Sequence, residues 1–180
     1  MDVTKIPPGK NPPDDINVLI EIPQGGVPVK YELDKASGAL FVNRFLHTAM
    51  YYPANYGFIP NTLAQDGDPI DCMALSQVPV APCAVIRCRP VGALLMEDEH
   101  GIDEKILAVP VEALNPYYDN VVNFSDLPSI MRDQIEHFFR HYKELEPGKW
   151  VRLGGWADRD KARDLIMKSI ERFTPVAHRA

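Results

Sequence analysis

The sequence is short of positive charge. It has 19 lysine and arginine residues against 25 aspartate and glutamate residues, which gives a formal net charge of −6 over 180 residues. Nucleic acid and anionic membrane surfaces attract proteins through clustered positive charge, so this balance argues against both as general partners. An anionic ligand would need a local cluster of cations or bound metal ions. The sequence therefore predicts no nucleic-acid partner and no membrane partner.

Cysteine is scarce, and no long hydrophobic run is present. The three cysteines are an odd number without regular spacing, which argues against a disulfide framework and fits a reducing compartment. The longest stretch without Asp, Glu, Lys or Arg covers residues 45–65 and contains His47, Asn55 and Asn61, so it is no membrane span. The first residues lack the apolar segment of a secretory signal. We therefore expect a cytoplasmic protein.

Proline, by contrast, is abundant, at 17 of 180 residues, where about 5% is usual. Four prolines fall in residues 1–15, which we expect to form an extended arm that the rest of the protein holds only in part. The length favours one domain over residues 1–180. Residues 174–180 carry no pattern, and we expect this tail to fray.

Short β-type runs and two late helices make up the remaining pattern. The runs are separated by Gly, Pro, Asn and Asp and cover residues 16–22, 27–33, 39–45, 84–89, 92–96, 106–109 and 150–153. Apolar spacings of three and four predict amphipathic helices over residues 128–145 and 158–173. Their predicted buried faces are Met131, Ile135, Phe138, Tyr142 and Leu145, and Ala162, Leu165, Ile166, Ile170 and Phe173. The predicted fold is α+β and mainly β, a compact barrel with two helices outside it.

Three carboxylates are concentrated in residues 66–71, which read Asp-Gly-Asp-Pro-Ile-Asp. Gly67 and Pro69 favour a tight turn, which brings together charges that repel by roughly 1 kcal/mol per pair at 4 Å in water. The turn is either a solvated acidic loop or a site for hard divalent cations, which take oxygen ligands. It is no EF-hand, because Asp71 stands where that loop requires glycine.

Charged residues also share faces of extended segments elsewhere. Asp103 and Lys105 are two residues apart, so both point to one side, which suits a site for a metal and an anion as well as a polar hairpin tip. Lys30 and Glu32 share a face in the same way. Glu21 lies on the preceding run and Arg44 on the following one, so three successive strands offer charges of both signs. Charges in this arrangement either line a cavity or, as is more usual, form a face that is exposed to solvent.

These segments occur in a characteristic order with residues 52–60, Tyr-Pro-Ala-Asn-Tyr-Gly-Phe-Ile-Pro, and with residues 137–143, His-Phe-Phe-Arg-His-Tyr-Lys. Together they closely resemble the soluble family I inorganic pyrophosphatases of the bacterial type, over roughly residues 16–173. The resemblance implies an OB-like five-stranded β-barrel with two flanking α-helices. It also implies Mg²⁺-dependent hydrolysis of inorganic pyrophosphate to two orthophosphates, with several ions per active site, and assembly into a homohexamer.

The same resemblance implies a role for twelve residues. Asp68 is expected to be the general base for the attacking water. The expected metal ligands are Asp66, Asp71 and Asp103, with Asp98 and Glu21 for further ions. The expected pyrophosphate-binding residues are Lys30, Arg44, Tyr56, Lys105, Tyr142 and Lys143.

Three other interpretations fit these residues less well. A single-strand nucleic-acid binder would use the same barrel with its tyrosines for stacking, but the net charge and the acidic clusters oppose it. A divalent-cation buffer would leave the nearby cations Lys30, Arg44 and Lys143 unexplained. Zinc at the helical pair His137 and His141 lacks a third ligand nearby in sequence. We expect this pair, with Glu144, to pack against a neighbouring subunit instead.

Overall fold

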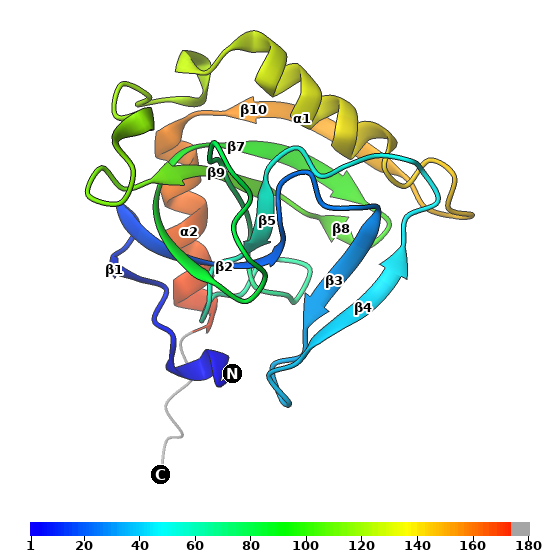
Figure 1. The fold of residues 1–180 in the computed structure, drawn as a ribbon, viewed down its shortest axis with the longest axis horizontal. Coiled ribbons are helices and arrows are strands. Elements are labelled where there is room, and N and C mark those ends of the chain that lie inside the picture. The colour runs from blue at the N-terminus through cyan, green and yellow to red at the C-terminus, as the bar shows by residue number, and fades with distance from the viewer. Residues whose placement is uncertain (174–180) are drawn as a thin grey trace.

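A closed ring of five strands forms the centre of the computed structural model, which describes residues 1–173. The tail predicted for residues 174–180 lies outside the described residues. Around the ring lie β2 (Asp15–Ile22), β5 (Asn55–Phe58), β6 (Asp71–Ala74), β9 (Lys105–Pro110) and β7 (Val85–Asp98) (Figure 1). Each pairs with the next, and β7 pairs back with β2. The β6–β9 pair is parallel and the other four are antiparallel. This ring, with two helices outside it, confirms the predicted fold class.

Further strands extend the ring and stand beside it. β1 (Gly9–Asn11) pairs with β2, while β8 (Gly101–Ile102) and β10 (Val151–Ala157) pair with β7. A separate antiparallel hairpin of β3 (Val29–Leu33) and β4 (Leu40–Phe45) projects beside the ring (Figure 1). Short 3₁₀ helices occupy Val3–Lys5, Pro116–Tyr118 and Phe124–Asp126.

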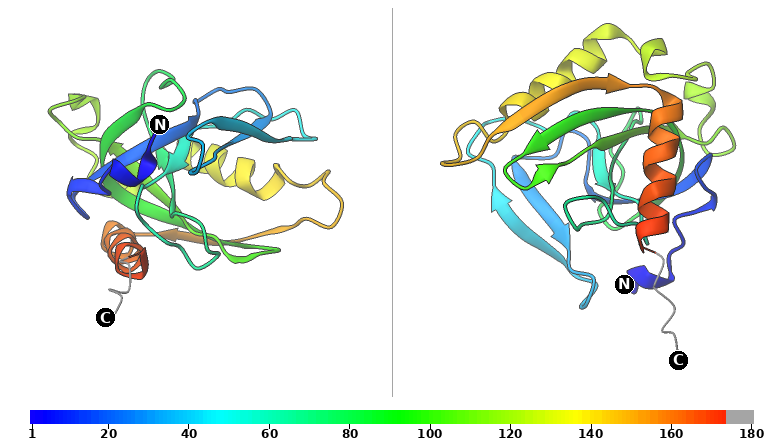
Figure 2. Two further views of the ribbon diagram at one scale, coloured as in Figure 1. Left: turned by 90° about the horizontal axis from the view of Figure 1, so that it is seen from below. Right: turned by 180° about the vertical axis from the view of Figure 1, so that it is seen from behind.

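The two helices cover different sides of the strands. α1 (Ser129–His141) packs on β10, and α2 (Arg159–Phe173) lies behind the ring against β7 (Figure 2). One hydrophobic cluster lies beneath α1 and another lies between the ring and α2. Within residues 1–173, no helix has both the length and the apolar character that crossing a membrane requires.

α1 ends earlier than predicted, and the last residue predicted to be buried in each helix is exposed. α1 stops at His141 rather than at residue 145, because the chain then folds into successive turns, with the Glu144 N–H donating to the His141 carbonyl at 2.9 Å. Leu145 is consequently 61% exposed instead of buried. Phe173, also predicted to be buried, is 41% exposed at the last residue of α2.

The ring contains two strands that the sequence analysis missed. β5 and β6 have four residues each, too few to show a period, and β6 begins inside the acidic turn at Asp71. Gly57 allows β5 to approach β2 closely, since a Cβ there would lie 1.8 Å from the Leu19 carbonyl oxygen. In contrast, the two runs predicted at 84–89 and 92–96 form the single strand β7, which accommodates Pro90 at a shift of register.

The proline-rich arm is held more firmly than predicted. Val3 is buried, β1 adds to the edge of β2, and the Asn17 side-chain amide donates to the Pro7 carbonyl at 2.9 Å. The arm thus belongs to the body of the protein. The three cysteines, Cys72, Cys83 and Cys88, are all free.

Candidate active site

All twelve residues selected from the sequence line one cavity of about 450 Å³. Seven of them come from strands, one from each strand of the ring and one each from β3 and β4, so the ring and the β3–β4 hairpin together form its walls. These residues are Glu21, Lys30, Arg44, Tyr56, Asp66, Asp68, Asp71, Asp98, Asp103, Lys105, Tyr142 and Lys143. The structure therefore brings together charges of both signs that lie far apart in the sequence.

The acidic turn forms one edge of the cavity. Gly67 has a φ of +95°, a conformation that glycine adopts without strain, and the Asp68 N–H donates to Asp66 Oδ1 at 3.0 Å. The Asp68 side chain is 80% exposed, with the Lys35 ammonium 3.8 Å away. Asp68 can therefore reach a water molecule or ligand at the mouth of the cavity.

A buried lysine lies at the base of the cavity. The Lys105 ammonium contacts the carboxylates of both Asp71 and Asp103, and the Tyr56 hydroxyl donates to Asp71 at 2.5 Å. Burial alone would lower the pKa of Lys105, but the two carboxylates outweigh it and raise this pKa above its ordinary value. Lys105 is therefore a fixed positive charge, and its predicted placement on one face with Asp103 is confirmed.

Two further carboxylates occupy different environments. Burial raises the pKa of Glu21 to about 8, although its carboxylate accepts the Leu33 N–H at 2.7 Å. Burial also acts on Asp98, but hydrogen bonds from Lys143 and from the His100 N–H outweigh it and lower the Asp98 pKa. A cation bound beside Glu21 would stabilise its charged form, whereas the charged form of Asp98 already has the Lys143 ammonium beside it.

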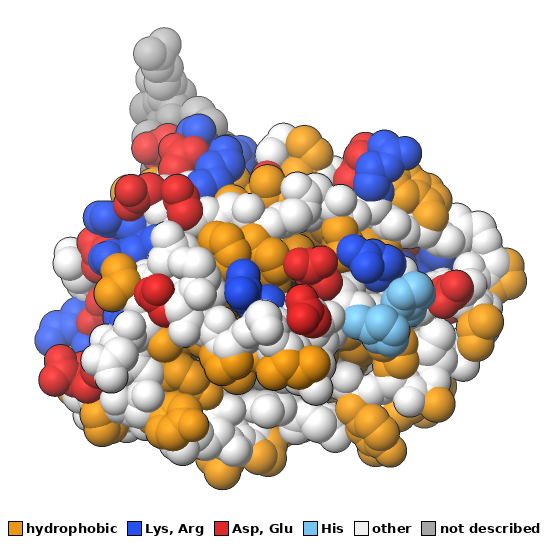
Figure 3. Space-filling view, turned by 90° about the horizontal axis from the view of Figure 1, so that it is seen from above, with side chains coloured by type: hydrophobic (Ala, Val, Ile, Leu, Met, Phe, Trp, Pro, Cys, Tyr) orange, Lys and Arg blue, Asp and Glu red, His pale blue; other side chains and the backbone are white. Residues whose placement is uncertain are grey.

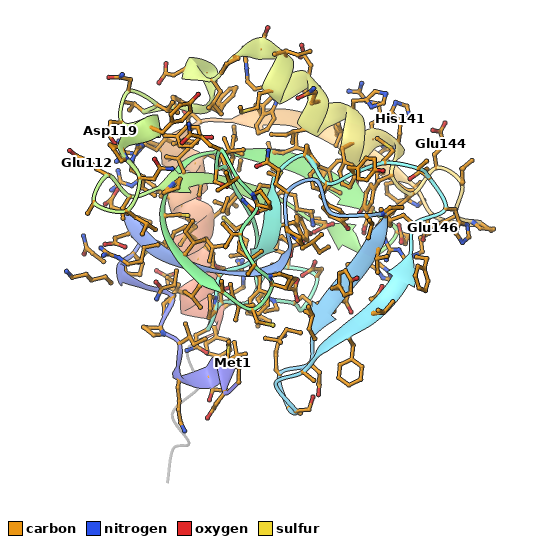
Figure 4. All side chains as sticks on the ribbon, in the orientation of Figure 1. Met1, Glu112, Asp119, His141, Glu144 and Glu146 are labelled. Carbon is orange, nitrogen blue, oxygen red and sulfur yellow. The ribbon has the colours of Figure 1, made fainter. Side chains whose placement is uncertain are left out.

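Arg44 is oriented by a residue that sequence reasoning missed. Its Nε donates to Glu146 at 3.1 Å, and Glu146 also pairs with Lys149 at 2.9 Å. Figure 4 labels Glu146, which lies near the end of β4. The Nη2 atom of Arg44 is buried without a hydrogen-bond partner among the described residues, so this guanidinium retains a donor for an anion. No local signal in the sequence joins Arg44 to Glu146, which lies 102 residues away.

The donor set suits a hard divalent cation, because the carboxylates that line the cavity offer oxygen ligands. Within residues 1–173, no three His, Cys, Asp or Glu side chains gather into a group that could hold a metal ion as they stand. The carboxylates of Asp71, Asp103 and Asp98 pair with lysines instead. The same finding leaves the described pair His137 and His141 without a third zinc ligand.

Comparisons with known proteins agree with this site. The family model for inorganic pyrophosphatase matches residues 18–174. The inorganic pyrophosphatase of Caulobacter vibrioides is 61% identical over 173 residues, which cover 96% of this chain and 98% of that protein. The crystal structure of an inorganic phosphatase from Anaplasma phagocytophilum has a TM-score of 0.92 at 54% identity, and the match covers 94% of this chain and 99% of that one.

The inorganic pyrophosphatase structure from Thermus thermophilus has a TM-score of 0.91 at 41% identity, and the match covers 96% of this chain and 99% of that one. High identity over nearly the whole length, together with one cavity lined by acidic, basic and tyrosine side chains, leads to a single conclusion: the chain belongs to the inorganic pyrophosphatase family and is a hydrolase of this class.

Proposed function

We propose that the protein hydrolyses inorganic pyrophosphate to two orthophosphates with Mg²⁺, using a metal-activated water and Asp68 as general base. The observation that carries this proposal is the mixed lining of the cavity, in which eight carboxyl side chains stand beside six lysine and arginine side chains and three tyrosines. Pyrophosphate is a multiply charged anion, and phosphoryl transfer depends on positioning and on stabilising that charge. A site with both oxygen ligands and fixed cations meets both needs.

A divalent metal cofactor follows from membership of this family. Asp66, Asp71 and Asp103 would hold Mg²⁺ ions, with Asp98 and Glu21 for further ions. When bound, such ions lower the pKa of coordinated water and neutralise phosphoryl oxygens. The aspartates and Glu21 contribute only oxygen donors, which fit a hard cation better than a soft one.

The remaining residues would either accept a proton or bind the phosphates of the substrate. Asp68 would accept the proton of the attacking water, since its carboxylate is exposed at the mouth of the cavity. Lys30, Arg44, Lys105 and Lys143 would hold the phosphates. Burial raises the pKa of both Tyr56 and Tyr142, so their hydroxyls stay protonated and can donate hydrogen bonds.

Chelation gives the direct test. We expect the protein to release phosphate from pyrophosphate when Mg²⁺ is present. The release should stop in excess chelator and return when Mg²⁺ is restored. The release is measured colorimetrically, with a no-enzyme reaction at each Mg²⁺ concentration as the control. Undiminished hydrolysis in excess chelator would contradict the metal-dependent mechanism.

Binding without chemistry explains this cavity less well. A cation buffer would gain nothing from Lys105, which lies between two carboxylates that would otherwise bind metal. A nucleic-acid partner would meet the same carboxylates at a chain with net charge −6. We accordingly keep the predictions of no nucleic-acid partner, no membrane partner and a cytoplasmic setting.

We propose that the protein assembles into a homohexamer, and that the outer face of α1 forms a contact between its copies. The rings of His137 and His141 lie 4.6 Å apart, and His141 Nδ1 is 3.0 Å from Glu144 Oε2. Histidines stand beside acidic and basic side chains on this face (Figure 3), and His141 and Glu144 project from it (Figure 4). Tyr51 and Ile130, both 63% exposed, line a second, open pocket together with His137. This face offers polar and apolar contacts to a second copy.

The assembly is expected to depend on pH, because histidine gains charge between about pH 8 and pH 5, and equal charges on two copies repel unless Glu144 or another carboxylate compensates them. The mass measured by light scattering should therefore fall towards acid pH. A double variant, His137→Ala with His141→Ala, should lose this dependence, and Lys168→Ala on α2 serves as the control. A monomer at every pH would contradict the proposed hexamer.

A further inference from the structure

The acidic turn leaves the body of the protein through residues 61–63, which we call the anchor. Each residue of the anchor is bonded to a different part of the molecule. We propose that Thr62 is a positioning residue for the acidic turn, and that Asn61 and Leu63 hold the anchor in place on either side of it. This inference rests on the roles proposed above for Asp66 and Asp68.

Thr62 closes the base of the turn. Its side chain is buried, with the residue 1% exposed. The hydroxyl donates to the Ile59 carbonyl at 2.6 Å and accepts the Ile70 N–H at 3.0 Å. One buried hydroxyl thus joins the chain before the turn to the chain after it, and Ile70 is the immediate neighbour of Asp71.

The two flanking residues tie the anchor to both ends of the described chain. The Asn61 side-chain amide donates to the carbonyls of Thr4 and Ile6 at 3.0 and 3.1 Å. Its φ of +54° lies in the left-handed region, which asparagine tolerates better than most residues. The backbone of Leu63 is held by α2, since its N–H donates to the Ser169 carbonyl at 2.9 Å and its carbonyl accepts Arg172 Nε at 2.8 Å.

Hydrogen bonds link residues 64–68 to one another. The Ala64 N–H donates to the Asp68 carbonyl at 2.6 Å, and the Asp68 N–H donates to Asp66 Oδ1 at 3.0 Å. These bonds fix the shape of the turn. Its place relative to Asp71 in β6 is set where the chain before the turn meets the chain after it, by the Ile59 N–H, which donates to the Ile70 carbonyl at 3.0 Å, and by the Thr62 hydroxyl, the side chain that bonds both segments. Misplacement by about 1 Å can cost about 100-fold in rate.

Three variants test the role of the hydroxyl. Thr62→Val keeps the shape of the side chain and removes both hydrogen bonds, whereas Thr62→Ser keeps the hydroxyl. Ser169→Ala is the matched control, because it removes a buried hydroxyl that donates to Ile166 inside α2. At a temperature where all are folded by circular dichroism, Thr62→Val should lower kcat about 10- to 100-fold and raise the Mg²⁺ concentration for half-maximal activity. Thr62→Ser should restore kcat, and Ser169→Ala should keep it.

Amide hydrogen exchange provides a readout that is independent of activity and metal. In the metal-free protein, the Ile70 amide of Thr62→Val should exchange at least about tenfold faster than in the wild type, because its acceptor is gone. Arg172→Ala covers the case in which Thr62→Val fails to fold, since Arg172 is on the surface. It should also raise the Mg²⁺ requirement, while Lys168→Ala on the same helix should not.

The outcomes separate this inference from the proposed function. Equal kcat and equal Mg²⁺ requirement in Thr62→Val and Ser169→Ala, with an active wild type, would overturn the positioning role alone. Unchanged exchange at Ile70 would do the same. A wild type without Mg²⁺-dependent hydrolysis would overturn the proposed function and this inference together.

Discussion

Replacing Asp68 with asparagine is expected to lower kcat by about 100- to 10,000-fold, the usual cost of losing a general base. The Mg²⁺ concentration for half-maximal activity should change far less. Asp71→Asn, in contrast, should impair both quantities. The difference follows from position, because Asp68 is exposed at the mouth, whereas Asp71 lies against Lys105 and accepts the Tyr56 hydroxyl.

Steady-state rates over a Mg²⁺ titration distinguish these two effects. Asp160→Asn is a suitable control, because this carboxylate is 88% exposed on α2 and lies outside the cavity. A kcat near the wild-type value in Asp68→Asn would show that another group removes the proton from water. Equal damage to kcat and to the Mg²⁺ requirement in both variants would make Asp68 a ligand rather than a base.

Lys105→Met is expected to affect stability and activity together. The Lys105 side chain is 3% exposed, and its removal would leave Asp71 and Asp103 facing each other with little solvent. Breaking a buried pair in this way typically costs about 3–5 kcal/mol in the free energy of unfolding. Activity should fall as well, since the cavity would lose its most deeply buried cation.

Urea unfolding in the presence of chelator measures the stability effect without a contribution from bound metal. Lys35→Met is the matched control, because Lys35 is 50% exposed and its pairing with Asp68 at 3.8 Å should contribute at most about 1 kcal/mol. If Lys105→Met lost no more stability than Lys35→Met, the buried ion pairs of Lys105 would contribute little to the free energy of unfolding.

Local spacing explains why much of the site could be predicted. Side chains two residues apart share a face of a strand, and both pairs chosen on this ground are in contact, Lys30 with Glu32 and Lys105 with Asp103. The resemblance in sequence supplied the rest, including Tyr142 and Lys143 just after α1. Their chemical roles remain predictions, but their convergence on one cavity is a property of the fold.

The features that escaped prediction depend on contacts between distant parts of the chain. β5 and β6 are strands because the ring pairs them on both sides, and segments of only four residues carry no periodic signal of their own. Glu146 matters to the site because the turns after α1 bring it to Arg44. Leu145 fails as a core residue for the same reason, since those turns replace the last turn of the predicted helix.

The closure of the ring between β2 and β7 has a consequence for how the protein folds. This pairing joins Ile16 to Cys88 and Leu19 to Val85, so β5 and β6 lie between its partners in the chain. Contacts between residues so far apart in sequence slow folding, because the entropy of a long loop is lost before they form. We therefore expect β2 and β7, the strands that carry Glu21 and Asp98, to be the last of the ring to pair. In a refolding experiment, hydrolytic activity should therefore return only in the slowest structural phase, after most secondary structure has formed.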